Sequence, residues 1–274
     1  MPAAPTTPSP AREPAISLRG VSIGYDGRAI VEDIDLDVLS GEILFVGGGS
    51  GCGKTTLLSC MTTLRPPLAG SIVIGGTDIA RASEEELERV RRRFGVMYQM
   101  GALFGGMDLL ENVRLPLEEF STLSRAEMDD VARAKLGLVG LGAHWMKKPS
   151  EISGGMQKRA AIARALALDP PIVFLDEPSA GLDPVTSADL DAMIVAINRM
   201  LGTTFVIISH ELASIFAIGQ RFAMLDGARR RLVALGPPEE LRDRSPDEWV
   251  RRFLSRTPSG EGQHGEAHAA RSTA

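Results

Sequence analysis

The sequence has no apolar run that approaches the roughly 18 residues a helix needs to span a bilayer. It has only two cysteines, Cys52 and Cys60, whose spacing matches neither a zinc site nor a CxxC redox motif, so we expect a reducing compartment. Basic residues are not in excess, because 30 lysines and arginines stand against 35 acidic residues, for a net charge of −5. This balance argues against a nucleic-acid binder that works through a broad basic surface.

Both ends of the 274-residue chain have the composition of unfolded segments. The opening "MPAAPTTPSPAREP" lacks the apolar core of a secretory signal and holds too much proline for a helix. The closing "RTPSGEGQHGEAHAARSTA" is dominated by small and polar residues. We predict disordered tails at residues 1–14 and 257–274. Between them, at residues 15–256, we predict one domain, since 44% hydrophobic content is enough for a full core.

The order of predicted elements indicates an α/β fold. From about residue 16 to 79, short β-like runs alternate with glycine turns, which predicts a small antiparallel sheet beside one strand that feeds a helix. Ser83 opens a capped helix, "SEEELERVRRRF", and residues from about 103 to 167 have a mostly helical pattern. The later apolar runs "PIVFLD" and "TTFVIIS" flank the helical "PVTSADLDAMIVAINRML", which is typical of parallel strands. We therefore expect a mostly parallel sheet, an antiparallel β subdomain and a helical subdomain at about 103–167.

A glycine-rich segment, "GGGSGCGKTT", lies between the apolar run "EILFV" and the helical "TTLLSCM". It contains the P-loop pattern of a glycine, four residues, and then glycine, lysine and threonine. Its backbone N–H groups can point at a β-phosphate, Lys54 supplies charge to the β- and γ-phosphates, and Thr55 offers a hydroxyl to Mg²⁺. A glycine-rich turn with an incidental lysine is the plainer alternative, and the flanking strand and helix argue against it. The predicted nucleotide-binding residues here are Gly48, Gly49, Ser50, Gly51, Cys52, Gly53, Lys54, Thr55 and Thr56.

The run "PIVFLDEP" ends a predicted buried strand in two acidic residues, Asp176 and Glu177. Ligands of α/β sheets bind at the carboxyl ends of strands, so we expect this pair beside the phosphate loop. Asp176 is the predicted partner of Mg²⁺, through water, and Glu177 is the candidate base that polarises the attacking water. The alternative is a pair of acids that caps the following helix, and the nearby P-loop favours the catalytic interpretation.

Two further polar residues follow predicted strands. His210 comes after "FVIIS", where an imidazole either donates to a γ-phosphate oxygen and senses its loss, or only caps the next helix. Gln99 follows "FGVMY", where an amide either ligates Mg²⁺ or positions water, or simply lies on the surface. Each residue taken singly leaves its alternatives open.

The stretch "ISGGMQKRAAIARAL" predicts a helix that begins Ser153-Gly154-Gly155, with three basic residues close behind. Glycine costs about 1 kcal/mol relative to alanine in a helix interior, so a pair of them needs a reason. One interpretation is a serine N-cap with a tight entry turn. The other is an anion site, formed by bare N–H groups at the positive end of the helix. The stretch by itself favours the N-cap, and the rest of the chain must decide between the two.

Taken in order along the chain, these motifs resemble those of the ATP-binding cassette (ABC) ATPases, over about residues 16–254. The resemblance implies the ABC form of the P-loop NTPase fold, ATP hydrolysis with ATP and Mg²⁺ as cofactors, and a head-to-tail homodimer. In that family Gln99, Glu177 and His210 would be catalytic, and Mg²⁺ would be held by Thr55, Gln99 and Asp176. Tyr25, in "VSIGYDG", falls where the family stacks an aromatic ring on adenine; the alternative is a turn tyrosine.

The family's serine–glycine–glycine helix start binds the γ-phosphate of an ATP held by the opposite subunit. The resemblance therefore implies roles in trans for Ser153, Gly154, Gly155 and, in "SAGLD", Asp183. The usual pattern is leucine–serine–glycine–glycine–glutamine, and this chain has Ile152 and Met156 at the first and last positions. The contribution of the glutamine is thus lost, while the serine hydroxyl and the backbone donors remain.

Three segments look like those of the Mla/Mce-type phospholipid transport ATPases: "YQMGALFGGMDLLENVRLPL", "SGGMQKRAAIARA" and "SHELASIFAI", with Met100 in place of the usual serine. This implies a bacterial complex with integral membrane permease subunits and an Mce-domain lipid-binding protein, moving phospholipid or a related lipid between the inner and outer membranes. The chain would lie in the cytoplasm, on the cytoplasmic face of the inner membrane. The alternatives are an amino-acid or other small-solute importer, and a soluble cassette acting on ribosomes or DNA. The latter expects two cassettes or a coiled-coil insertion, which the sequence lacks.

Overall fold

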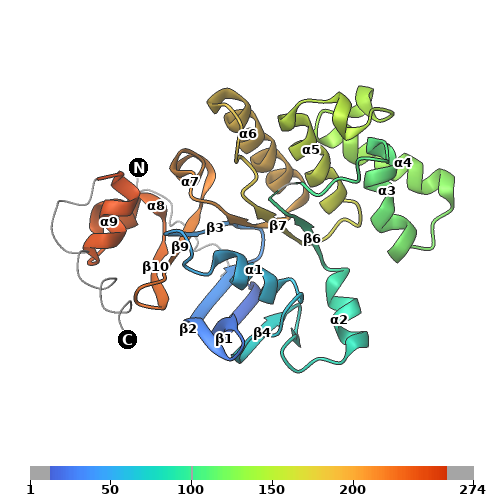
Figure 1. The fold of residues 1–274 in the computed structure, drawn as a ribbon. Coiled ribbons are helices and arrows are strands. Elements are labelled where there is room, and N and C mark those ends of the chain that lie inside the picture. The colour runs from blue at the N-terminus through green and yellow to red at the C-terminus, as the bar shows by residue number, and fades with distance from the viewer. Residues whose placement is uncertain (1–12, 100, 258–274) are drawn as a thin grey trace, which may run out of the picture.

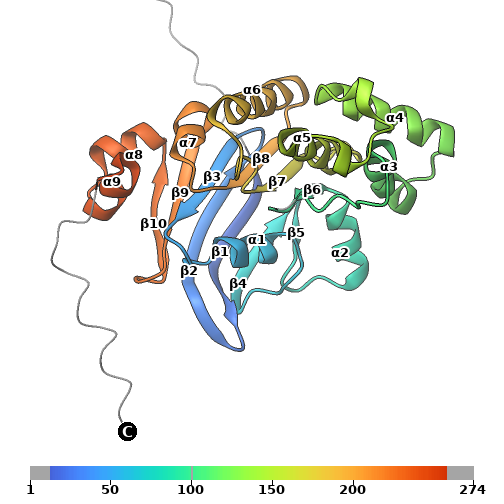
Figure 2. The same ribbon diagram turned by 45° about the horizontal axis from the view of Figure 1, so that its top comes forward.

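Two β-sheets form the centre of the protein, and helices flank them (Figure 1, Figure 2). The computed structural model describes residues 13–99 and 101–257. Within these ranges, the smaller sheet has four antiparallel strands in the order β2-β1-β4-β5. The larger has six strands in the order β10-β9-β3-β8-β7-β6, all parallel except the edge strand β10. This confirms the predicted α/β class, with a mostly parallel sheet beside an antiparallel one.

The strands are β1 (Pro14–Tyr25), β2 (Arg28–Leu39), β3 (Ile43–Gly48), β4 (Ala69–Ile74), β5 (Thr77–Asp78), β6 (Phe94–Met97), β7 (Ile172–Asp176), β8 (Thr204–Ile208), β9 (Arg221–Asp226) and β10 (Arg231–Gly236). The α-helices are α1 (Lys54–Met61), α2 (Glu84–Arg91), α3 (Leu109–Phe120), α4 (Arg125–Leu138), α5 (Gly154–Ala165), α6 (Pro184–Leu201), α7 (Leu212–Ile218), α8 (Pro238–Arg244) and α9 (Glu248–Ser255). Short 3₁₀ turns occupy Gly142–His144 and Pro149–Glu151.

The ends of the folded region differ slightly from the prediction. Pro14 was assigned to the N-terminal tail, but it begins β1 and pairs with Leu39. At the other end, the N–H of Thr257 donates to the carbonyl of Arg252 and closes the last helix. The remaining residues of the two predicted tails lie outside the described residues, as does Met100.

The parallel strands are buried on both faces, which explains their continuous apolar runs. Successive residues alternate between two hydrophobic cores: Phe45 and Phe205 lie in one, whereas Leu44 and Val206 lie in the other. The first core packs the sheet against α3 to α6, and the second packs it against α1 and the antiparallel sheet. The period of two along a strand thus divides the protein into layers.

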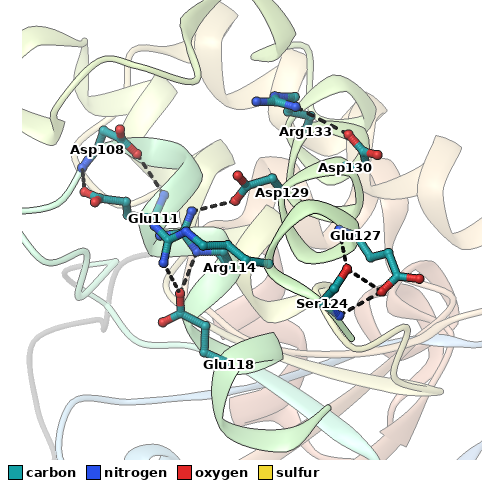
Figure 3. A network of polar contacts seen from close by, with 10 residues as sticks. Asp108, Glu111, Arg114, Glu118, Ser124, Glu127, Asp129, Asp130 and Arg133 are labelled. Carbon is teal, nitrogen blue, oxygen red and sulfur yellow. Dashed lines mark hydrogen bonds and ion pairs between the residues drawn. The ribbon is translucent and has the colours of Figure 1, made fainter. Parts of the chain in front are cut away.

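The helices α3 and α4 form a unit at one end of the molecule, opposite α8 and α9 (Figure 1). Each begins with a capping box, in which Asp108 or Ser124 exchanges hydrogen bonds with the glutamate three residues later. Arg114, whose side chain is 6% exposed, joins the two helices: it donates to Glu118 and to Asp129 of α4, each at 2.6 Å (Figure 3). The guanidinium is buried and paired on both sides. Removal of either carboxylate would therefore leave the buried charge of Arg114 only partly paired, which costs stability.

A close approach between β6 and α5 fixes the position of that helix. A Cβ added to Gly95 would lie 1.8 Å from the carbonyl oxygen of Ala165, so only glycine allows this contact.

We expect Gly95→Ala to lower the free energy of unfolding by about 1–3 kcal/mol or more, because the helix must move away from the sheet. Gly137→Ala is the matched control, since it lies in α4 with no atom near the new Cβ. We expect that variant to gain roughly 0.5–1 kcal/mol. Urea unfolding measures both, and equal stabilities would contradict the close packing.

Candidate active site

The P-loop joins β3 to α1 in a conformation that requires its glycines. Gly48, Gly51 and Gly53 have φ angles of +139°, +72° and +99°, which other residues rarely adopt. A Cβ on Gly48 would also lie 2.1 Å from the carbonyl oxygen of Leu225. Gly53 precedes α1 without any side-chain cap, so the N–H groups at the start of that helix remain available to an anion.

Lys54 places its charge at this loop. Its Nζ donates to the carbonyls of Gly48 and Gly49, each at 3.0 Å, and lies 3.7 Å from the sulfur of Cys52. Cys52 is 1% exposed, so its thiol is shielded within the loop. The P-loop and Lys54 therefore have the arrangement that the glycine-rich pattern predicts.

Neighbouring strands place the other predicted residues at one edge of the sheet. Asp176 ends β7, Gln99 follows β6, and His210 follows β8, and these three strands are adjacent and parallel to β3. The carboxyl ends of parallel strands are where α/β sheets bind ligands. The residues Gln99, Asp176, Glu177 and His210 thus share an edge with the P-loop.

Glu177 is held by both its backbone and its side chain. Its φ of +49° is a left-handed conformation, unusual for this residue, and its N–H donates to the carbonyl of Ile208 at 2.8 Å. One carboxylate oxygen lies 2.7 Å from Nδ1 of His210, and the other accepts from Ser209 at 3.4 Å. Strained backbone of this kind gathers at functional sites. No pattern in the sequence predicts the contact between His210 and Glu177 or the hydrogen bond from Ser209.

The charge on Asp176 is disfavoured in the folded protein. Burial raises the pKa of Asp176 above the ordinary carboxyl value, and the neighbouring charge of Glu177 adds to this effect. The ammonium groups of Lys158 and Lys54 act in the opposite direction without reversing the shift. Lys158 lies on α5, and its proximity to the acids was not predicted. The only signal in the sequence was the basic residues behind the glycine pair.

A divalent cation fits this edge of the sheet if its other ligands come from elsewhere. Among the residues of the described ranges, no group of three or more His, Cys, Asp or Glu side chains could hold a metal by itself. Asp176 and the hydroxyl of Thr55 are hard oxygen ligands of the kind Mg²⁺ prefers, and Mg²⁺ usually takes its remaining oxygens from phosphates and water. The donor set therefore suits a cation that arrives with a nucleotide.

The predicted helix start is an N-cap, and it lies apart from the P-loop. The Ser153 hydroxyl accepts from the N–H of Met156 at 3.3 Å, so the capping interpretation holds within the chain. A Cβ on Gly155 would lie 2.6 Å from Thr186 of α6, but one on Gly154 would meet no atom within 4 Å. Packing thus explains one glycine and leaves the other, exposed one unexplained.

Asp183 also serves its own chain. Its carboxylate caps α6, accepting from the N–H groups of Val185 and Thr186 at 3.0 Å each. Hydrogen bonds from Thr186 lower the pKa of Asp183 below the ordinary carboxyl value. Across residues 13–99 and 101–257, no hydrogen bond or ion pair links Ser153 or Asp183 to the P-loop.

Tyr25 adjoins the P-loop helix. Its hydroxyl accepts from Thr56 at 3.1 Å, and the Arg65 guanidinium lies 4.2 Å from the ring centroid. The residue is 44% exposed, so part of the ring is open to a planar ligand. This placement is compatible with the predicted adenine contact.

A strand–P-loop–helix unit with acids at neighbouring strand ends defines a P-loop nucleoside triphosphatase. The family model described as ABC transporter matches residues 31–180. The chain belongs to the ABC transporter family and is an ATPase of that family.

Similar proteins include ATP-binding proteins that are named for two kinds of transport. A probable ribonucleotide transport ATP-binding protein mkl from Mycobacterium leprae is 43% identical over 88% of this chain and 69% of its own length. In other mycobacteria the chain spans 66% of the corresponding protein. The intermembrane phospholipid transport system ATP-binding protein MlaF from Escherichia coli strain K12 is 38% identical over 89% of this chain and 90% of its own length.

Solved structures show the same fold. A dimeric ATP-binding cassette in a post-hydrolysis state, bound to ADP and Pi, superposes with a TM-score of 0.73 at 29% identity, covering 81% of this chain and 98% of that one. A cassette from Clostridium perfringens, part of a CbiONQ complex, has a TM-score of 0.78 at 24% identity, covering 89% of this chain and 96% of its own. The predicted ABC form of the fold is confirmed.

The raised pKa of Asp176 leads to a prediction about stability. The folded protein binds this proton more tightly than the unfolded chain does, so ionisation of Asp176 costs stability as the pH rises through the raised pKa. The cost is complete once the pH exceeds the raised pKa of Asp176 in the folded protein. We expect Asp176→Asn to raise the melting temperature of the free protein at about pH 7, with the gain shrinking as the pH falls toward about 4, near the unfolded pKa.

The same variant should lose the stabilisation that ATP and Mg²⁺ together give the wild type, because the amide lacks the charge that favours the cation. Thermal melts with ATP and either EDTA or Mg²⁺ separate the two effects. A variant less stable than wild type at neutral pH would contradict the destabilised carboxylate.

Proposed function

We propose that this chain is the ATP-hydrolysing subunit of a bacterial transporter that moves phospholipid or a related lipid between the inner and outer membranes. The observation that carries the proposal is the relative named for intermembrane phospholipid transport, which this chain matches over 90% of that protein's length. The mycobacterial relatives are named for ribonucleotide transport, so the cargo is the point that needs a test. Neither relative is named for amino-acid transport.

The P-loop and the strand ends divide the chemistry between them. The loop N–H groups and Lys54 bind the β- and γ-phosphates, and Tyr25 contacts the adenine. Thr55, Gln99 and Asp176 would hold Mg²⁺, which supplies charge neutralisation at the phosphates. Glu177 accepts a proton from the attacking water, and the hydrogen bond to His210 fixes the direction of its carboxylate. His210 is 69% exposed at its side chain, so it can also reach a γ-phosphate.

Two chains are needed to complete the site. Within residues 13–99 and 101–257, the hydroxyl of Ser153 makes no hydrogen bond besides the cap to Met156, and a Cβ on Gly154 would meet no atom within 4 Å. The dipole of this exposed helix start favours an anion. In a head-to-tail homodimer, Ser153, Gly154, Gly155 and Asp183 of one chain would face the P-loop of the other. The relative solved as a dimer with ADP and Pi supports this arrangement.

The membrane partners would dock beside the ATP site. No helix in the described part of the chain is long and apolar enough to cross a membrane, so we propose that separate permease subunits, with an Mce-domain lipid-binding protein, supply the membrane path. Phe104 is 52% exposed, yet its backbone is fixed by the fully buried Asn112, which accepts from its N–H at 2.8 Å and donates to its carbonyl at 3.1 Å. A rigidly held, exposed aromatic ring suits the groove for a partner's helix. Because it would dock on these permease subunits, the chain would lie on the cytoplasmic face of the inner membrane.

Purification from membranes tests the cargo. The complex is isolated in mild detergent through a tag on this chain, and its proteins, lipids and ribonucleotides are identified by mass spectrometry. We expect a permease, an Mce-domain protein and bound phospholipid. Enrichment of ribonucleotides without lipid, beyond the nucleotide held by the ATPase, would contradict the proposal.

Glu177→Gln tests the catalytic base. The amide keeps the shape of the side chain but cannot take a proton from water, so we expect ATP affinity to persist while turnover falls by roughly 10²–10⁴-fold. ATP-dependent dimers should then accumulate. Glu119→Gln, at an exposed glutamate on α3, is the control and should keep full turnover. Hydrolysis by Glu177→Gln at close to the wild-type rate would remove Glu177 from this role.

Phe104→Glu tests the docking surface. An exposed position tolerates a charge, so we expect a normal melting temperature and normal basal hydrolysis, with loss of assembly and of stimulation by the membrane partners. Leu103 is less suitable, because it packs partly against the core. Met200→Glu on α6 is the control, since this residue is 67% exposed on another element. Normal assembly and stimulation of Phe104→Glu would place the docking surface elsewhere.

A further inference from the structure

Two basic side chains of α5 hold the backbone that follows β6. Arg164 donates from Nη1 to the carbonyl of Ala102 at 2.7 Å and from Nη2 to that of Gly101 at 2.9 Å. Lys158 donates from Nζ to the carbonyl of Gln99. Three carbonyls of one short segment are therefore bound by a single helix.

The hydrogen bonds of Arg164 are unusual because they join a charged guanidinium to uncharged backbone carbonyls. Within the described ranges, Arg164 forms no ion pair with a carboxylate, and its hydrogen bonds go to backbone carbonyls. Burial lowers the pKa of Arg164, so the guanidinium is partly desolvated without a counter-charge. An arrangement that costs desolvation and has no ion pair to offset it points to a requirement for the geometry itself.

The held backbone is also strained. Gly101 has a φ of +70° and Ala102 a φ of +50°, and the latter is unfavourable for a residue with a Cβ. A planar guanidinium that bonds two successive carbonyls can hold such a conformation, whereas a lysine ammonium lacks the fixed fork. The strain is thus maintained by α5.

The consequence lies at the catalytic edge of the sheet. Gln99 is the last described residue before this strained turn, so the position of its side chain depends on where its backbone is held. Burial lowers the pKa of Lys158, and the charges of Asp176 and Glu177 oppose that shift, which places the ammonium within electrostatic reach of both acids. Lys158 thus links the backbone of Gln99 to the same acids that Gln99 is proposed to assist.

We propose that Arg164 and Lys158 are positioning residues, which hold the backbone at Gln99, Gly101 and Ala102 so that the Gln99 amide is aligned for ATP hydrolysis. This inference rests on the proposed catalytic role of Gln99. Because the same helix begins at Ser153, the alignment of Gln99 at one ATP site is also tied to the helix start offered to the partner's site.

The test is a double-mutant cycle on the full-length protein, with basal ATP hydrolysis and ATP binding as readouts. We expect Arg164→Gln and Gln99→Ala each to lower kcat by roughly tenfold or more, because the first loses a charged hydrogen bond and the second loses a positioned group. The Kd for ATP should stay within about threefold of the wild-type value. The double variant should be no slower than the slower single variant, because Arg164 acts through Gln99. Arg164→Lys, which keeps the charge, should recover part of the rate.

Arg159→Gln is the matched control. It removes a charge from the neighbouring turn of α5, and no hydrogen bond or ion pair of Arg159 to the Gln99–Ala102 backbone occurs in the described structure. We expect wild-type kcat from it. Lys158→Met should lower kcat in the same manner as Arg164→Gln, and it provides a second variant if Arg164→Gln fails to fold.

The outcomes separate this inference from the function beneath it. If Gln99→Ala is slow but the losses multiply in the double variant, or if Arg164→Gln and Lys158→Met both match Arg159→Gln, the positioning role is wrong and the ATPase assignment stands. If ATP binding falls in parallel with kcat and Arg164→Lys gives no recovery, the two residues are only structural and the inference fails. If Gln99→Ala has wild-type kcat, the proposed role of Gln99 is wrong, and the inference fails with it.

Discussion

The parallel pairing of β3, β8, β7 and β6 is the constraint on which the rest of the structure depends. Parallel strands end at a common edge, and each of these strands is followed by a residue with a chemical role, so the sheet alone brings the P-loop, Gln99, the two acids and His210 together. The same pairing buries the strands on both faces. A polar residue within a strand would disrupt a core, and this is why the chemistry begins only where the strands stop.

Unusual backbone conformations occur at this edge, and the surrounding residues hold them. Gly48 in the P-loop, Ala102 after β6 and Glu177 after β7 all have positive φ angles. Two of them are held by hydrogen bonds: the carbonyl of Ala102 accepts from Arg164, and the N–H of Glu177 donates to the carbonyl of Ile208. A backbone held in one unfavourable conformation is a backbone that does not need to reorganise during the reaction, which is the advantage of preorganised polar groups.

The sequence was sufficient for features whose physics is local. The P-loop, the capped helix at Ser83 and the buried strands were predicted because each is set by a short pattern of glycines, caps or apolar residues. Contacts between distant segments were not predictable in this way. The bond between His210 and Glu177, the grip of Arg164 on Ala102 and the exposure of Phe104 depend on how separate elements pack, and no spacing along the chain encodes them.

Two lysine side chains supply positive charge near the neighbouring carboxylates of Asp176 and Glu177. Lys54 and Lys158 approach Asp176 from opposite elements, α1 and α5, and both lower its pKa, although burial and Glu177 outweigh them. Lys54 is committed to the P-loop carbonyls and Lys158 to that of Gln99, so neither forms a direct ion pair with the acid. The charge of Asp176 is therefore left partly uncompensated, and we propose that a divalent cation carried by the nucleotide would relieve its repulsion with Glu177. On this proposal, part of the affinity for the metal–nucleotide complex would arise from the unfavourable charge of Asp176 in the free protein.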